Sequence, residues 1–140
     1  MTRSWRLVCA LALLAACTPT DTPAQGGGRW KTEIEQAEAA ARRGDRREAT
    51  RLASAIVAQY TRAASNSSAD HVHAGRAYVL LSTGNASAAR SALAAFDAGA
   101  ADKTNLEATR RTGDLFLEKY NAPDARLSYE SVLARAPNDA

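Results

Sequence analysis

The feature that most constrains the fold of this 140-residue chain is a signal for ending one helix and starting the next, which occurs three times. Each time, a residue placed for the left-handed end of a helix is followed by an Asp or Asn suited to cap the next helix. The three pairs are Gly44 and Asp45, Gly84 and Asn85, and Tyr120 and Asn121. Between them Ala, Leu, Arg and Glu dominate and no strand-like alternation persists. The chain therefore predicts helix, tight turn and helix three times.

These signals recur at a nearly regular interval. Ala49, Ala89 and Ala125 each stand four residues after a predicted cap, and they are 40 and 36 residues apart. This interval is close to the roughly 34-residue unit of the tetratricopeptide repeat, which is a helical hairpin. A small residue at this position lets the second helix of a hairpin lie close to the first.

The third unit resembles the tetratricopeptide repeat most closely. Gly113, Phe116, Ala125, Tyr129 and Pro137 stand where that family places small, aromatic, small, aromatic and helix-stopping residues. The second unit lacks the proline, and the first lacks nearly all the large residues. A three-hairpin α-solenoid of another type therefore stays open.

The resemblance implies an all-α fold, a right-handed α-solenoid of about three antiparallel helix hairpins. It places the units at about residues 30–61, 70–101 and 104–137 of one domain over residues 30–140. No polar capping helix follows the third unit, so we expect Leu127 and its helical neighbours to form a contact surface, for a partner or for a second copy.

The first 17 residues have the layout of a bacterial lipoprotein signal. Arg3 and Arg6 precede an apolar run over residues 7–16, which rises only about 15 Å as a helix, half of a ~30 Å hydrocarbon core. The run ends in Leu14-Ala15-Ala16-Cys17, which resembles the lipobox. The resemblance implies that residues 1–16 are a signal peptide and that Cys17 carries fatty acyl chains such as palmitate, which hold the chain in a membrane. An ordinary secretory signal with a chance cysteine is the alternative.

The residues after Cys17 favour a tethered protein of the cell envelope. Thr18, rather than the Asp associated with inner-membrane retention, favours the outer membrane, with the domain facing the periplasm. Residues 17–29 are rich in Pro, Thr and Gly and predict a lipidated, flexible tether with a reach of roughly 20 Å.

Composition excludes several classes of function. Cys9 lies in the predicted signal peptide and Cys17 is the lipidation site, which leaves no thiol for a disulfide, a zinc site or a nucleophile. Removing Arg3 and Arg6 reduces the formal net charge of +3 to about +1, which argues against a nucleic-acid partner.

Candidate catalytic and metal-binding residues are few. His71 and His73 are the only histidines, and on one helix their rings differ by about 200° of rotation, so they cannot clasp one metal ion together. The carboxylates alternate with Lys and Arg at helical spacings, which is typical of solvated helix faces. We therefore expect no enzyme activity, no cofactor and no metal.

The repeat resemblance implies a concave surface formed by the first helix of each hairpin. Charges of both signs flank one aromatic and several aliphatic side chains there, as in grooves that bind an extended or helical peptide. Merely exposed helix surface is the alternative interpretation. The candidate groove residues are Lys31, Glu38, Arg42, His71, Tyr78, Leu81, Arg110, Asp114 and Leu117.

These features together predict a membrane-anchored lipoprotein that acts as a protein-protein interaction scaffold or adaptor in the bacterial cell envelope, in assembly, secretion or pilus-type machinery. Its expected partner is an envelope protein or peptide. Two alternatives stay open: a self-associating structural subunit of the envelope, and an enzyme acting on peptidoglycan or another glycan.

Overall fold

The computed structural model describes residues 28–137 as six helices. Their bounds are α1 Lys31–Arg42, α2 Arg46–Arg62, α3 Ser68–Leu81, α4 Ala86–Ala100, α5 Leu106–Glu118 and α6 Ala122–Leu133. No strand occurs between residues 28 and 137, and the all-α prediction is confirmed. The predicted signal peptide, the lipidation site Cys17 and the predicted tether up to residue 27 lie outside the described residues.

The three predicted turns form as their residues dictate. Gly44, Gly84 and Tyr120 have left-handed φ angles of 81°, 71° and 62°. The Asp or Asn after each of them accepts a hydrogen bond from a backbone N–H in the first turn of the next helix. Each bond satisfies a donor that has no partner within the helix. The recurring turn signal is therefore confirmed.

One helix begins earlier than the sequence predicts. The second unit is expected from about residue 70, but α3 begins at Ser68 and is capped by Ser67. The hydroxyl of Ser67 accepts a hydrogen bond from the backbone N–H of Asp70 at 3.1 Å, and the carboxylate of Asp70 accepts one from the backbone N–H of Ser67 at 3.0 Å. This reciprocal pair is a capping box. Its Ser-x-x-Asp spacing is visible in the sequence, but the prediction overlooked it.

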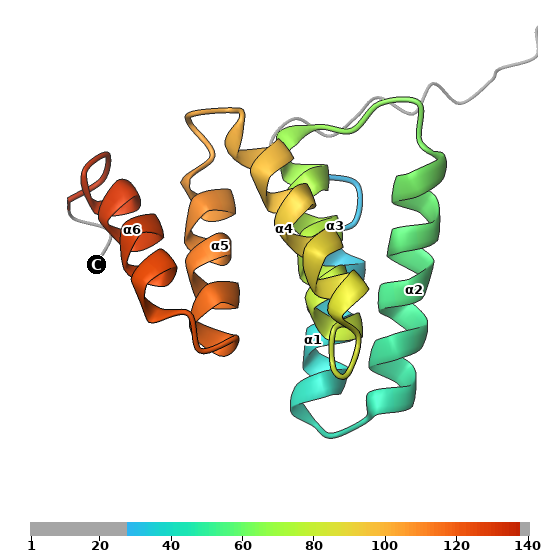
Figure 1. The fold of residues 1–140 in the computed structure, drawn as a ribbon. Coiled ribbons are helices and arrows are strands. Elements are labelled where there is room, and N and C mark those ends of the chain that lie inside the picture. Colours follow the sequence, from blue (N-terminus) through green and yellow to red (C-terminus); the bar gives the residue numbers. More distant parts are fainter. Residues whose placement is uncertain (1–27, 138–140) are drawn as a thin grey trace, which may run out of the picture.

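The helices pair as three hairpins that follow one another in space. α1 packs on α2, α3 on α4 and α5 on α6, while α2 contacts α3 and α4 contacts α5 (Figure 1). α3 also contacts both α1 and α5, so the first helices of the hairpins are neighbours. This pairing order is that of stacked hairpins. The right-handed sense of the solenoid stays a prediction.

The core is built mainly where hairpins meet. Trp30, Ile34 and Ile56 form a buried cluster with three alanines, one of which belongs to α3. Phe96 forms a second cluster with Leu115 of α5 and one alanine. Each cluster therefore joins one hairpin to the next, as expected for repeats that cannot bury their apolar faces alone.

Small residues set the close approach within each hairpin. Ala49 and Ala125, which the sequence predicts for this role, are buried. Ala89 is only partly buried, and its neighbours Ala88 and Ala92 face inward in its place. The most buried alanines of α4 are therefore Ala92 and Ala95 rather than the predicted Ala89.

Candidate functional site

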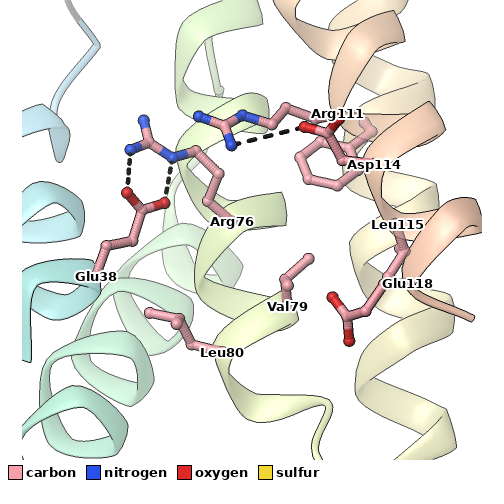
Figure 2. Close-up of a pocket in the computed structure, with 9 residues that line it drawn as sticks. Glu38, Arg76, Val79, Leu80, Arg111, Asp114, Leu115 and Glu118 are labelled. Carbon is pink, nitrogen blue, oxygen red and sulfur yellow. Dashed lines mark hydrogen bonds and ion pairs between the residues drawn. The ribbon is translucent and has the colours of Figure 1, made fainter. Parts of the chain in front are cut away.

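A groove crosses the first helices of all three hairpins. Its cavity has a volume of about 80 Å³, which is smaller than the roughly 300–1,000 Å³ of pockets for small molecules. We define the groove by nine lining residues: Glu38 from α1; Arg76, Val79 and Leu80 from α3; Phe96 from α4; and Arg111, Asp114, Leu115 and Glu118 from α5. Figure 2 shows the aliphatic side chains between the charged ones.

Ion pairs join α1 to α3 across the groove. The carboxylate of Glu38 accepts two hydrogen bonds from the guanidinium of Arg76, both at 2.8 Å, in the two-pronged geometry that fits these groups best (Figure 2). The side chain of Arg76 is only 11% exposed. A largely buried cation needs such a partner, because an unpaired one would lose its hydration without compensation.

The chain of charges continues from α3 to the third hairpin. Arg76 lies 4.0 Å from a carboxylate oxygen of Glu107, which also lies 3.3 Å from Arg111. Arg111 lies 3.8 Å from Asp114, which accepts a 2.9 Å hydrogen bond from the hydroxyl of Tyr129 in α6. We call Glu38, Arg76, Glu107, Arg111 and Asp114 the ionic ladder. Its members stand on α1, α3 and α5, and the hydrogen bond from Tyr129 connects it to α6.

Glu38 and Arg76 hold each other in their charged forms near neutral pH. Burial alone would raise the pKa of Glu38, but the hydrogen bonds and charge of Arg76 outweigh it and lower that pKa. The same hydrogen bonds raise the pKa of Arg76. Glu38 therefore stays a carboxylate, whereas a catalytic acid for glycan cleavage needs a raised pKa. The Glu38–Arg76 pair therefore offers two ordered charges and no proton donor.

The structure brings together only some of the nine residues predicted for the groove. Glu38 and Asp114 line it, and Arg42 does not line it but lies 3.9 Å from Glu38. The other six residues are not among its lining: Lys31, His71, Tyr78, Leu81, Arg110 and Leu117.

On α3, the residues expected in the groove face neighbouring helices instead. Tyr78 packs against the cluster around Phe96 in α4, and Leu81 packs against the cluster of the first hairpin. The hydroxyl of Tyr60 in α2 lies 2.7 Å from Nδ1 of His71. On α3, the groove is lined by Arg76, Val79 and Leu80 rather than by these three residues.

The groove residue that sequence reasoning missed most clearly is Arg76. It is the one charged residue in the otherwise apolar stretch "VHAGRAYVLL" of α3. A lone arginine on a helix that is buried on most sides needs a carboxylate partner. The sequence therefore already indicated that Arg76 would form an ion pair with another helix. Arg111, next to the predicted Arg110, was missed by one position.

A second polar cluster fixes the start of the domain. The backbone N–H of Arg29 donates to Asp70 at 2.7 Å, and its guanidinium forms a 3.0 Å ion pair with the same carboxylate. The guanidinium also donates to the backbone oxygen of Ser65 and to the side chain of Asn66. Arg29 was predicted to end the flexible tether, and the structure makes it part of the folded domain.

Trp30, directly after Arg29, anchors this cluster in the core. The guanidinium carbon of Arg29 lies over the Trp30 ring, 4.7 Å from the ring centre. The same ring packs edge-on against the ring of Tyr60. The indole N–H donates to Gln59 at 3.0 Å. The aromatic side chain satisfies its one donor while it buries its rings.

The two histidines face different neighbours, as the helical spacing predicts. His71 meets Tyr60, whereas His73 is buried and has no hydrogen-bond partner for Nδ1 among the described residues. Burial and the nearby charge of Arg76 lower the pKa of His73. Between residues 28 and 137, no three potential metal-ligating side chains come together.

Comparison of this chain with known protein families, with curated proteins and with solved structures finds no match in any of the three. In the described part of the chain, no helix has both the length and the apolar character needed to cross a membrane.

Proposed function

We propose that this chain is a lipid-anchored scaffold of the bacterial cell envelope whose helical domain binds a segment of another envelope protein. The observation that carries the proposal is the ionic ladder, which presents ordered charges of both signs beside an apolar floor along one groove. Complementary charges select a partner and fix its register, while apolar contact supplies affinity.

The shape of the groove favours a protein segment over a small molecule. Val79, Leu80 and Leu115 contribute apolar surface, and the cavity of about 80 Å³ admits little more than the end of one side chain. The charges of Glu38 and Asp114 stand at opposite sides of this floor (Figure 2). A peptide with one apolar anchor residue and flanking polar residues meets these requirements.

The binding proposal is tested with two adjacent arginines of α5. Arg111 lines the groove and pairs with Glu107 and Asp114, whereas Arg110 is exposed and outside the groove. The lipid-anchored chain is isolated from envelopes with its partners, which are quantified by mass spectrometry. We expect Arg111→Glu to reduce recovery of one reproducible partner at least tenfold and Arg110→Glu to leave it unchanged.

Two further measurements keep this test specific. Arg111→Gln removes the charge without adding repulsion, so we expect it to give an intermediate loss. Thermal unfolding followed by circular dichroism shows whether each variant is folded. Equal recovery from a folded Arg111→Glu variant, or no reproducible partner at all, would contradict the proposal.

The anchoring proposal is tested separately. It rests on the sequence Leu14-Ala15-Ala16-Cys17 and on the charged and apolar residues before it. Cells grown with labelled palmitate should incorporate label into the wild-type chain and not into Cys17→Ser. Absence of label in the wild type would remove the lipid anchor from the proposal and leave the groove test unaffected.

A further inference from the structure

Tyr120 is an exposed aromatic residue in a backbone conformation that L side chains rarely adopt. Its φ angle is 62°, and it is the one residue other than glycine with a positive φ in the part of the chain that the structure describes. The equivalent residues in the other two turns are Gly44 and Gly84. The side chain of Tyr120 is 97% exposed, so it contributes nothing to the core in return for this conformation.

The three tight turns lie at one end of the molecule (Figure 1). A cleft is lined by residues of the helix ends beside these turns. Its volume is about 580 Å³. We call it the turn-end cleft and define it by its lining residues: Ala41, Arg46, Ala49, Thr50, Val79, Leu80, Leu81, Thr83 and Glu118. Five of these residues are apolar, and the other four contribute two hydroxyls, one cation and one carboxylate.

Tyr120 and the turn-end cleft share one face. Glu118 lines the cleft and stands two residues before Tyr120 in the chain. A contact related by a two-fold axis needs a protruding group and its receptor on the same patch, because both copies use the same surface. We propose that two copies of this chain associate through this face, with Tyr120 of each copy inserted into the turn-end cleft of the other.

The chemistry of the two surfaces is complementary. The cleft offers apolar contacts from Leu80 and Leu81 to an aromatic ring, and Thr50 and Thr83 offer hydroxyls to a phenol. Tyrosine is enriched at the centres of protein interfaces because it combines a rigid apolar ring with one polar end.

Charge complementarity favours a second copy over an unrelated partner. Arg46 forms no ion pair with any residue between 28 and 137, although it is exposed at the rim of the cleft. Glu118, which pairs with the adjacent Lys119 at 2.8 Å within one copy, stands two residues before the inserted Tyr120, so insertion carries this carboxylate toward the Arg46 of the second copy. The two-fold relation forms this pair twice.

This association does not depend on the proposed function, but it affects the same groove. Val79, Leu80 and Glu118 line both the groove and the turn-end cleft. Two associated copies would therefore narrow access to the groove from the turn end. The surface also differs from the contact predicted around Leu127 on α6.

The first test places a photoreactive group at the proposed contact in the full chain. Tyr120→p-benzoylphenylalanine is expressed in cells, irradiated and analysed by mass spectrometry. We expect an adduct of two copies, with cross-links within residues 46–50 or 79–83. The same group at Leu127, which is 58% exposed on α6, is the control and should give at least tenfold less of this adduct.

The second test reverses the two charges. Arg46→Glu and Glu118→Arg should each reduce the two-copy adduct at least tenfold, and the chain carrying both changes should recover most of it. Circular dichroism checks that each variant folds. A dominant adduct with another protein, no adduct, cross-links outside the cleft, or no recovery in the double variant would overturn the proposal.

Discussion

At the scale of single residues, Asp70 joins the start of α3 to the first residues of the folded domain. Its carboxylate completes the capping box of α3 by accepting a hydrogen bond from the backbone N–H of Ser67, and it holds Arg29 at the start of the domain. Its burial alone would raise its pKa, but hydrogen bonds from the backbone N–H groups of Arg29 and Ser67, and from their side chains, lower that pKa from 3.8 to about 2. The carboxylate therefore favours the folded state while it is ionised.

This shift predicts an acid-dependent loss of stability. A lowered pKa in the folded state stabilises the fold above about pH 4, and the contribution disappears as the pH falls toward 2. We expect Asp70→Asn to lower the unfolding free energy by about 2 kcal/mol at pH 7 and much less at pH 2. Urea unfolding at both pH values measures the difference. Asp97→Asn, at an exposed side chain, is the control and should change neither value.

Gly75 provides a residue-scale prediction about packing. A Cβ atom at this position would lie 2.3 Å from the ring of Phe96, which is closer than real Cβ atoms come to other atoms. Replacing glycine by alanine inside a helix ordinarily stabilises by about 1 kcal/mol. Here we expect Gly75→Ala to destabilise by about 1–3 kcal/mol, because the ring must move in a packed core.

A double-mutant cycle checks the cause. Phe96→Leu removes the ring edge, so Gly75→Ala should cost less in that background than in the wild type. Equal costs in the two backgrounds, or stabilisation by Gly75→Ala alone, would show that Phe96 does not restrict this position.

At the scale of helices and turns, Tyr120 and Gly84 provide a matched comparison. Both have left-handed φ angles, and a Cβ at Gly84 would meet no atom within 4 Å. We expect Tyr120→Gly to stabilise the domain by about 1 kcal/mol and Gly84→Ala to destabilise it by about the same amount, because a side chain disfavours this conformation. Thermal and urea unfolding measure both changes. Changes of the same sign would mean that contacts, rather than backbone conformation, decide the stability of these turns.

The elements were largely predictable from the sequence because their signals are local. Asp45, Asn85 and Asn121 accept hydrogen bonds from residues only three positions away, so the chain within each turn determines its conformation. The cap at Ser67 has an equally local signal that was overlooked.

The groove was less predictable because its residues depend on how whole helices rotate against one another. α3 buries residues around most of its circumference, so no polar stripe marks the face that lines the groove. Arg76 enters the groove because Glu38 of α1 lies opposite, and the two are far apart in the chain. Local patterns do not encode such pairings, and the repeat resemblance placed other residues of α3 in the groove.

At the scale of the whole molecule, the buried core is unevenly distributed along the stack. The first cluster joins α1, α2 and α3 through Trp30, Ile34, Ile56 and their neighbours. α6 buries only Ala125 and Val132, and α5 is the one helix it packs on among those described. Because stability in stacked hairpins is close to a sum over units and their interfaces, α6 should open at a lower free energy than α3.

Amide hydrogen exchange of the full chain, followed by mass spectrometry of peptides, tests this gradient. We expect peptides from α6 to exchange at least tenfold faster than peptides from α3 under native conditions. Val132→Ala removes one of the few buried side chains of α6, so it should speed exchange in α6 and leave exchange in α1 and α2 unchanged. Ile56→Ala should instead speed exchange in the first hairpin. Uniform protection across all six helices, or equal acceleration of exchange everywhere in Val132→Ala, would contradict this gradient. Either result would indicate that the domain unfolds as one cooperative unit. The interface between the second and third hairpins would then be as stable as the core of the first hairpin.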